Sequence, residues 1–192
     1  MQSKGTIVIP KNRVGVLIGQ EGRSKNQIES TLNIDLNISS ETGIVEIVPK
    51  SEKTDPVATL RARDIITAIG RGFSPENAFL LFDDDVVFDL IDLRETFDKN
   101  ENDIRRMKGR IIGEQGKTRR IIEEMTRAHV SIFGDTVGFI GDYEAISIAR
   151  EAVELILEGK QHATIYRFLR SKRREVKKKQ TLELWEKPVR PP

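Results

Sequence analysis

The chain of 192 residues contains no cysteine, and aromatic residues make up only 6% of it. The absence of cysteine excludes disulfides and thiolate metal ligands, and it fits the reducing cytoplasm in which we expect this protein. No apolar run is long enough to cross a membrane, so we expect no membrane-spanning helix and no signal peptide. The sequence also lacks a phosphate-binding P-loop, a Ser-His-Asp or Cys-His arrangement and a His-rich metal spacing. We therefore predict a protein that is not an enzyme and has no metal or cofactor.

Charged residues are abundant, but they are distributed unevenly. The net charge is only +2, from 32 basic and 30 acidic residues. Residues 74–103 contain ten acidic and two basic residues, whereas residues 104–120 contain seven basic residues and one acidic residue. Residues 161–180 contain eight basic residues and one acidic residue. Clusters of positive charge are typical of a protein that binds a polyanion, although any one cluster could also be a solvated face.

Two parts of the chain resemble each other at a spacing of 94 residues. Ile18-Gly19 aligns with Ile112-Gly113, and Gly22 aligns with Gly116. Further along, Ala62 aligns with Ala149 at a spacing of 87 residues, so the second copy is seven residues shorter. An internal duplication of this length predicts two similar domains.

Each copy contains the same predicted order of elements: strand, helix, Gly-x-x-Gly, helix, strand, strand, helix. Hydrophobic periodicity predicts that the last helix of the first copy has a buried face formed by Leu60, Ile65, Ile66 and Ile69. In the second copy, residues 97–103 are predicted to form a polar loop before a helix over 104–112. We divide the chain into a first domain (1–73), a packed helical linker (74–85), a second domain (86–160), a basic C-terminal helix (161–180) and a flexible tail (181–192).

The two glycine pairs have a physical use. Glycine lets the backbone turn sharply and lets another backbone approach closely. The helix after each pair presents free N–H groups and the positive end of its dipole, which favour a phosphate. The glycine pairs therefore predict phosphate contacts beside the basic clusters.

The order of elements, with Ile-Gly-x-x-Gly between two helices, resembles the type I K-homology (KH) domain. The resemblance implies an α+β fold in which each domain is a three-stranded antiparallel sheet packed on helices. It covers nearly the whole chain, and it implies a loop that clamps about four nucleotides of single-stranded RNA. The run from Ile112 to Arg119, followed by Ile122-Glu123 and Thr126-Arg127, resembles the archaeal partner-of-Nob group of ribosome-assembly factors.

Several functional expectations are implied by this resemblance alone. They are binding of the 3′ end of small-subunit rRNA through the second domain, proximity to the Nob endonuclease, and a link to the alpha subunit of translation initiation factor two. The sequence also differs from common KH domains in two ways. Lys25 and Arg119 stand where an aliphatic residue is usual, and both pairs between the glycines, Gln20-Glu21 and Glu114-Gln115, include an acid.

We expect the second site to bind RNA more strongly, because it has more basic residues. Ile112 is a candidate to support a base, but it is equally compatible with a place in the core. The predicted RNA-binding residues are Arg110, Ile112, Gly113, Glu114, Gln115, Gly116, Lys117, Arg119 and Arg120, with Gly19, Gln20, Glu21, Gly22, Arg23 and Lys25 in the first domain. Lys11, Arg13, Arg173, Arg174, Lys177 and Lys178 are predicted to add positive charge.

Three other functions are compatible with the sequence. One is a KH-type binder of another single-stranded RNA. Another is a protein-interaction scaffold linked to translation initiation, with the first domain and the linker around Phe79 and Phe82 as the contact surface. The third is an enzyme that holds Mg²⁺ in the acidic run from Asp83 to Asp92, although these residues fit better as a solvated strand edge.

Overall fold

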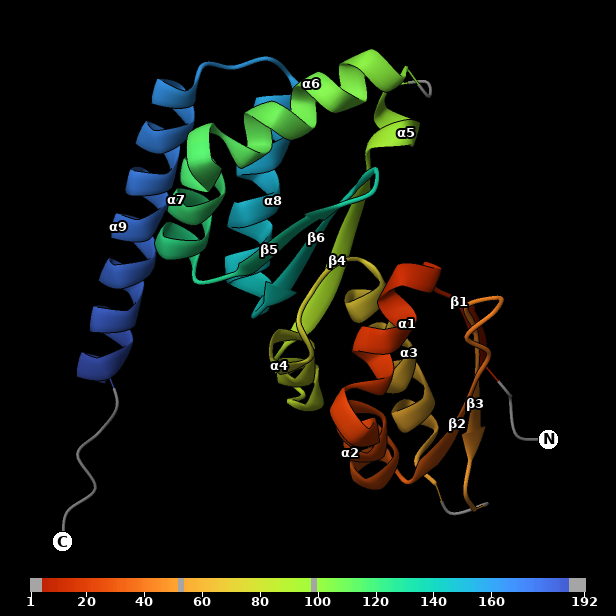
Figure 1. The fold of residues 1–192 in the computed structure, drawn as a ribbon. Coiled ribbons are helices and arrows are strands. Elements are labelled where there is room, and N and C mark those ends of the chain that lie inside the picture. The colour runs from red at the N-terminus through yellow and green to blue at the C-terminus, as the bar shows by residue number, and fades with distance from the viewer. Residues whose placement is uncertain (1–4, 52–53, 98–99, 187–192) are drawn as a thin grey trace, which may run out of the picture.

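The structure, a computed structural model, describes residues 5–51, 54–97 and 100–186. It contains two three-stranded antiparallel sheets, each covered by helices on one face (Figure 1). The first domain comprises β1 (Gly5–Val8), α1 (Lys11–Ile18), η1 (Gln20–Gly22), α2 (Arg23–Leu32), β2 (Ile34–Ile38), β3 (Ile44–Pro49) and α3 (Pro56–Gly70).

The first sheet has the strand order β1-β3-β2, and its alternating apolar residues face the helices. Helix α3 begins where Asp55 accepts a hydrogen bond from the backbone N–H of Val57 and proline occupies the first turn. The prediction for Leu60 is wrong, because its side chain is 60% exposed. The buried stripe of α3 runs through Ala58, Ala62 and Ile65, and Leu60 lies on the opposite side of the helix.

The second domain repeats this arrangement with the strand order β4-β6-β5. It comprises β4 (Val87–Asp92), α5 (Leu93–Thr96), α6 (Glu101–Ile112), η3 (Glu114–Gly116), α7 (Lys117–Thr126), β5 (His129–Phe133), β6 (Thr136–Gly141) and α8 (Tyr143–Leu157). The predicted hairpin through Gly134-Asp135 is confirmed by the pairing of β5 with β6.

The predicted loop at 97–103 needs correction at its C-terminal end. Helix α6 already begins at Glu101, because the Asn100 side chain accepts hydrogen bonds from the backbone N–H groups of Asn102 and Asp103. Glu101 and Asp103 also place negative charge at the positive end of the helix dipole. Residues 98 and 99 of the predicted loop lie outside the described residues.

A long helix, α9 (His162–Glu186), follows the second domain and packs along α7 and α8 (Figure 1). Its buried residues Ile165 and Leu169 join the core of the second domain. The helix continues six residues into the segment where we predicted a flexible tail. The sequence from Thr181 to Glu186 contains no proline or glycine, and the first proline comes at position 188, so nothing local ends the helix earlier. The rest of the predicted tail, residues 187–192, lies outside the described residues.

The two domains are joined by a packed junction. The linker forms α4 (Pro75–Ala78) and η2 (Phe79–Phe82), and Phe73 before it is only 3% exposed. The Phe73 ring meets the Phe88 ring edge to face, with centroids 6.2 Å apart. Across the junction, the Ser131 hydroxyl donates a hydrogen bond to the backbone oxygen of Arg71. The linker therefore covers the outer face of the second sheet, and Ile140 of β6 belongs to the first core.

The observed order β-α-α-β-β-α, present twice, is the tandem type I KH arrangement that the sequence predicted. None of the described helices combines the length and the apolar character needed to span a membrane.

Candidate nucleic-acid interface

The two glycine loops have nearly the same backbone conformation. Gly19 and Gly113 adopt φ values of 74° and 72°, and Gly22 and Gly116 adopt 77° and 76°. Within each loop the residue before the second glycine, Glu21 or Gln115, is also left-handed. In each copy, the loop therefore connects the two helices with the same sharp turn.

The two glycines of a loop have different roles. An added Cβ at Gly113 would collide with the side chain and backbone nitrogen of Thr118, and one at Gly19 would collide with Ser24. At Gly116 nothing lies within 4 Å of the position of an added Cβ. The first glycine is thus required for packing onto the following helix, whereas Gly116 leaves open space at the start of α7.

The basic residues beside the two loops differ in whether they form ion pairs with acidic residues. Near the second loop, Lys117 and Arg120 are exposed and make no ion pair among the described residues. In the first domain, Arg23 pairs with Glu21 at 3.4 Å, and Lys25 pairs with Glu29 at 3.7 Å. The second loop therefore has more positive charge available for an anion.

The unusual Lys25 and Arg119 are explained by a contact that both domains share. Arg119 pairs with Glu123 at 3.7 Å, as Lys25 pairs with Glu29. The Glu123 carboxylate in turn accepts a hydrogen bond of 2.9 Å from the backbone N–H of Val130 on β5. Glu29 accepts the equivalent bond from Leu36 on β2 at 2.7 Å. Each glutamate therefore satisfies a strand N–H that faces away from the sheet, and the basic residue balances its charge. Glu29 and Glu123 are 94 residues apart, as the two glycine loops are, but no local sequence pattern indicates this role.

Arg13 and Arg110 are held in structural contacts. The Arg110 guanidinium donates to the backbone oxygens of Ile156 at 3.2 Å and Lys160 at 2.5 Å, at the end of α8. Arg13 donates to the equivalent oxygens of Ile69 at 2.8 Å and Phe73 at 2.5 Å, at the end of α3.

Each arginine therefore places positive charge at the negative end of a helix dipole. Arg13 also lies 5.7 Å from the centroid of the Phe133 ring, across the domain junction. Burial lowers the pKa of the Arg13 guanidinium. Arg13 keeps its positive charge, but two of its guanidinium nitrogens are already bonded to backbone oxygens. The two guanidinium NH groups of Arg110 are occupied in the same way.

Helix α9 contacts the residues on both sides of the second glycine loop. The Tyr166 hydroxyl lies 3.2 Å from the Thr118 hydroxyl, in hydrogen-bonding distance, and Thr118 is 2% exposed. Near the start of α9, the His162 Nε2 lies 3.0 Å from the backbone oxygen of Arg110. The first domain has Ser24 at the position of Thr118, but no long helix follows it. Nothing in the local sequence connected Tyr166 with the loop, because 48 residues separate it from Thr118.

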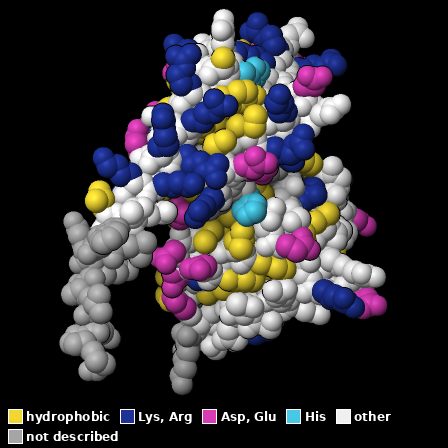
Figure 2. Space-filling view, turned by 90° about the vertical axis from the view of Figure 1, so that its left-hand side faces the viewer, with side chains coloured by type: hydrophobic (Ala, Val, Ile, Leu, Met, Phe, Trp, Pro, Cys, Tyr) yellow, Lys and Arg dark blue, Asp and Glu magenta, His cyan; other side chains and the backbone are white. Residues whose placement is uncertain are grey.

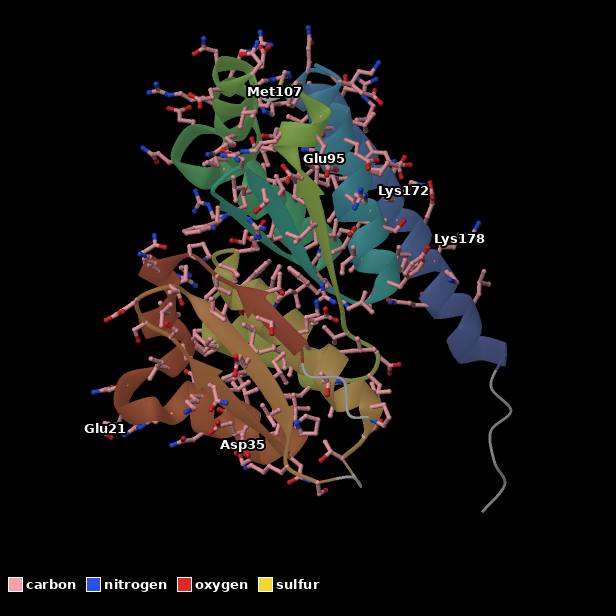
Figure 3. The ribbon with its side chains drawn as sticks, turned by 90° about the vertical axis from the view of Figure 1, so that its right-hand side faces the viewer. Glu21, Asp35, Glu95, Met107, Lys172 and Lys178 are labelled. Atoms are coloured by element: carbon pink, nitrogen blue, oxygen red, sulfur yellow. The ribbon has the colours of Figure 1, made fainter. Side chains whose placement is uncertain are left out.

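The remaining predicted residues lie on the surface of the molecule. Ile112, beside the loop, is 38% exposed, whereas its neighbour Ile111 is fully buried in the core. Arg173, Arg174, Lys177 and Lys178 are exposed on α9. Figure 2 shows basic side chains gathered on the face that carries α7 and α9. Glu21 marks the loop of the first domain, at the edge of the molecule opposite Lys172 and Lys178 of α9 (Figure 3). Gln20, Glu114 and Lys11 are also exposed.

The acidic run is engaged in local contacts. Asp84 pairs with Arg61, and Asp83 and Asp92 accept hydrogen bonds from nearby backbone N–H groups. Asp89 lies 2.5 Å from Arg150, and this hydrogen bond raises the pKa of the Arg150 guanidinium. In residues 5–51, 54–97 and 100–186, no group of three or more His, Cys, Asp or Glu residues could hold a metal ion.

Family models match both halves of the chain. The model of the second KH domain of PNO1, described as a eukaryotic-type KH domain of type I, matches residues 87–174. The model of the first KH domain of Krr1 matches residues 3–84.

Two relatives match across both halves of the chain. KH domain-containing protein MJ0443 of Methanocaldococcus jannaschii is 48% identical over 179 residues, which cover 93% of this chain and 78% of that protein. Pre-rRNA-processing protein PNO1 of Coccidioides immitis is 30% identical over 141 residues, which cover 73% of this chain and 54% of that protein.

Two crystal structures resemble the whole molecule. The Aeropyrum pernix protein APE0754 superposes with a TM-score of 0.89 and 35% identity, over 96% of this chain and 98% of that one. Dim2p of Pyrococcus horikoshii, in a complex with a/eIF2alpha and rRNA, superposes with a TM-score of 0.83 and 42% identity, over 90% of this chain and 95% of that one. Because the similarity runs through both glycine-loop domains and most of each of these chains, the chain belongs to the family of tandem KH-domain proteins that includes PNO1 and Dim2p.

Proposed function

We propose that this chain is a cytoplasmic assembly factor of the small ribosomal subunit. In this proposal it binds single-stranded RNA at the 3′ end of small-subunit rRNA or its precursor, mainly through the second domain. One observation carries the proposal. The loop at Gly113–Gly116 combines open space at the start of α7 with Lys117 and Arg120, which are exposed and unpaired with any acid among the described residues.

The proposed binding follows from the geometry of this loop. An RNA phosphate approaches the start of α7, where free N–H groups and the helix dipole favour negative charge. Lys117 and Arg120 neutralise the phosphates, and the exposed side chain of Ile112 supports an unstacked base. Glu114 opposes this binding by roughly 1 kcal/mol or less, because an exposed carboxylate is well screened. The neighbouring basic residues more than offset that cost.

Helix α9 contributes a second kind of affinity. The exposed residues Arg173, Arg174, Lys177 and Lys178 extend the positive surface beyond the loop. Contacts of this kind are independent of sequence and weaken as salt concentration rises. We therefore assign selectivity to the loop region and general attraction to α9.

The relatives support an RNA-binding role in rRNA processing. A further relative, from Dictyostelium discoideum, is named an RNA-binding protein, and the Coccidioides immitis relative is named a pre-rRNA-processing protein. The Pyrococcus horikoshii relative was crystallised with rRNA and a/eIF2alpha. We propose that this chain holds the rRNA end for the Nob endonuclease and is itself not an enzyme.

A second proposed function assigns protein binding to the first domain. Its basic residues Arg23 and Lys25 are paired with acids, and Arg13 is bonded in the domain junction. This leaves less free charge for RNA, and the alpha subunit of initiation factor two is the candidate partner. Calorimetric titration of that subunit into this protein, with and without RNA, tests the assignment. Heat of binding that persists when RNA fills the second domain supports it, and no heat in either titration contradicts it.

The RNA preference is tested with short fluorescent RNAs. One copies the 3′ end of small-subunit rRNA, and the other has the same bases in scrambled order. At one fixed salt concentration, we expect the authentic RNA to bind with a Kd at least tenfold lower. Equal Kd values would contradict selective binding of the rRNA end.

A further inference from the structure

The basic residues of α9 are segregated around the helix. Five of them are exposed and make no ion pair among the residues that the structure describes: Arg167, Arg170, Arg174, Lys177 and Lys178. Because an α-helix turns by about 100° per residue, these positions fall within one arc of about 100°, on the side away from the core. We call this arc the basic face of α9.

The other lysines of α9 lie on a different side of the helix, and their charge is balanced. Lys172 pairs with Glu175 at 3.9 Å, and Lys179 pairs with Glu144 of α8 at 3.6 Å. Both lysines line a groove between α9 and α8. The positive charge that is available for a polyanion is therefore concentrated on the basic face.

Helix α9 holds the basic face as a rigid rod. Ile165 and Leu169 are buried in the core of the second domain. The helix has 25 residues, which span about 37 Å, and it contains no proline or glycine that could kink it. Arg170, Arg174 and Lys178 therefore lie in one row, about 6 Å apart along the helix axis.

The basic face begins beside the second glycine loop. The Tyr166 hydroxyl lies 3.2 Å from the hydroxyl of Thr118, in the first turn of α7, and Arg167 follows Tyr166 directly. From Arg167 the face continues for about 16 Å to Lys178. RNA that is joined to a strand held at the loop can therefore lie along α9.

The side chains of this face fit a duplex better than a single strand. Surfaces that bind single-stranded RNA combine basic residues with aromatic side chains on which the bases stack. Within residues 162–182, the tyrosine and phenylalanine rings belong to Tyr166 and Phe168, which are both half-buried. The basic face thus offers a row of cations and no ring for a base. A duplex keeps its bases stacked inside and is recognised mostly through its shape, phosphates and 2′-hydroxyls.

The first domain provides an internal comparison. The segment that follows its last helix is the linker, and residues 74–85 contain four acidic residues and no basic residue. Such a segment repels a phosphate backbone, whereas α9 attracts one. The sequence therefore places the charge for an RNA duplex at the second domain.

We propose that the basic face of α9 binds the phosphate backbone of an RNA duplex that adjoins the single strand held at the second glycine loop. The ligand of the second domain is then a junction between paired and unpaired RNA. This inference rests on the proposed binding of single-stranded rRNA by the second domain, and it extends that site from the strand to the stem beside it.

The test compares RNAs that differ only in pairing. One RNA is an unpaired segment from the rRNA 3′ end. Two further RNAs carry a short hairpin, joined to the 5′ side of this segment in one and to its 3′ side in the other. Each hairpin RNA has a counterpart of equal length and composition, in which the stem bases are scrambled so that they do not pair. Hairpin and counterpart therefore carry the same number of phosphates.

Two double variants separate the basic face from the rest of α9. Arg174→Gln with Lys178→Gln removes two charges from the basic face. Lys172→Gln with Lys179→Gln, on the flank towards α8, is the matched control, because it lowers the net charge by the same amount. Glutamine forms helices about as well as lysine and arginine, so both variants should keep the fold, which circular dichroism checks.

For the wild type and the flank control, we expect one hairpin RNA to bind with a Kd about tenfold lower than its unpaired counterpart. The basic-face variant should lose most of this gain. The slope of its log Kd against log salt concentration should also fall by about one for each phosphate contact removed.

The duplex site is overturned if neither hairpin RNA binds more tightly than its counterpart, or if the basic-face variant keeps as much of the gain as the flank control. An acidic surface of a partner protein would then be the better candidate for this face. The unpaired segment alone tests the proposed function separately. If it binds selectively while the hairpins add nothing, only the duplex site fails, and if it does not bind, the proposed function fails.

Discussion

Arg13 and Arg110 make equivalent contacts in the two domains, although they do not occupy equivalent positions in the duplicated sequence. Both bind carbonyl oxygens at the end of the last helix, and those oxygens are equivalent at the spacing of 87 residues. The arginines themselves are not equivalent: the residue that aligns with Arg13 is Met107, about one helical turn before Arg110. The same contact is thus made in the two domains by arginines that lie about one helical turn apart in the aligned sequence.

We predict that Arg110→Ala destabilises the protein by about 1.5–3 kcal/mol, the usual contribution of hydrogen bonds to a charged group. The measurement is the free energy of unfolding in urea. Arg105→Ala, at an exposed position of the same helix, is the control and should change stability by less than about 0.5 kcal/mol. Equal stability of the two variants would show that the Arg110 contacts contribute nothing.

Three glycines near the second loop should respond differently to alanine. Gly109→Ala should stabilise the protein by roughly 0.5–1 kcal/mol, because the site is helical and nothing lies within 4 Å of the added Cβ. Gly116→Ala should cost roughly 1–2 kcal/mol for its left-handed backbone alone. Gly113→Ala should cost more, because its Cβ also collides with Thr118. Thermal unfolding gives the order, and a smaller loss at Gly113 than at Gly116 would refute the packing role.

At the scale of elements, α9 distinguishes the second domain from the first. The linker after α3 and the start of α9 follow equivalent glycines, Gly72 and Gly159, which both have positive φ. The linker turns away after Phe82, whereas α9 continues to Glu186 and packs on α7. In the part of the chain that the structure describes, a helix of this kind packs behind the glycine loop of the second domain and not behind that of the first.

Removing one hydroxyl tests this support. Tyr166→Phe deletes the hydrogen bond to the buried Thr118 and should lower stability by about 0.5–1.5 kcal/mol. RNA affinity should also fall, because the start of α7 is held less firmly. Tyr143→Phe is the control, since Tyr143 is 80% exposed. If Tyr166→Phe binds RNA as tightly as Tyr143→Phe does, α9 does not position the loop.

At the scale of the whole molecule, the sequence predicted those features of the fold that residues close together in the chain determine. Both glycine loops, the hairpin at Gly134-Asp135 and the order of strands and helices follow from residues close together in the chain. The contacts of Arg13 with Phe73, and of Tyr166 with Thr118, join residues 60 and 48 positions apart. No local pattern specifies such pairs. The packing of the domain junction and the contact of α9 with the second loop are therefore visible only in the structure. The domain limits of 1–73 and 86–160 remain our proposal.

The central claim is that the second glycine loop is the main RNA site. The most direct test compares the wild type with two double variants, Gln20→Asp with Glu21→Asp and Glu114→Asp with Gln115→Asp. Asparagine and aspartate are among the few residue types that tolerate the left-handed backbone at positions 21 and 115, so the loops should keep their fold while repelling phosphate. Binding is measured to the rRNA 3′-end RNA and to its scrambled control at one salt concentration.

The account predicts that the variant of the second loop loses at least tenfold in affinity for the authentic RNA, while the variant of the first loop changes little. Equal binding of all three proteins to both RNAs would contradict it. That result would assign RNA binding to the basic surface of α9 and would leave the glycine loops a structural role.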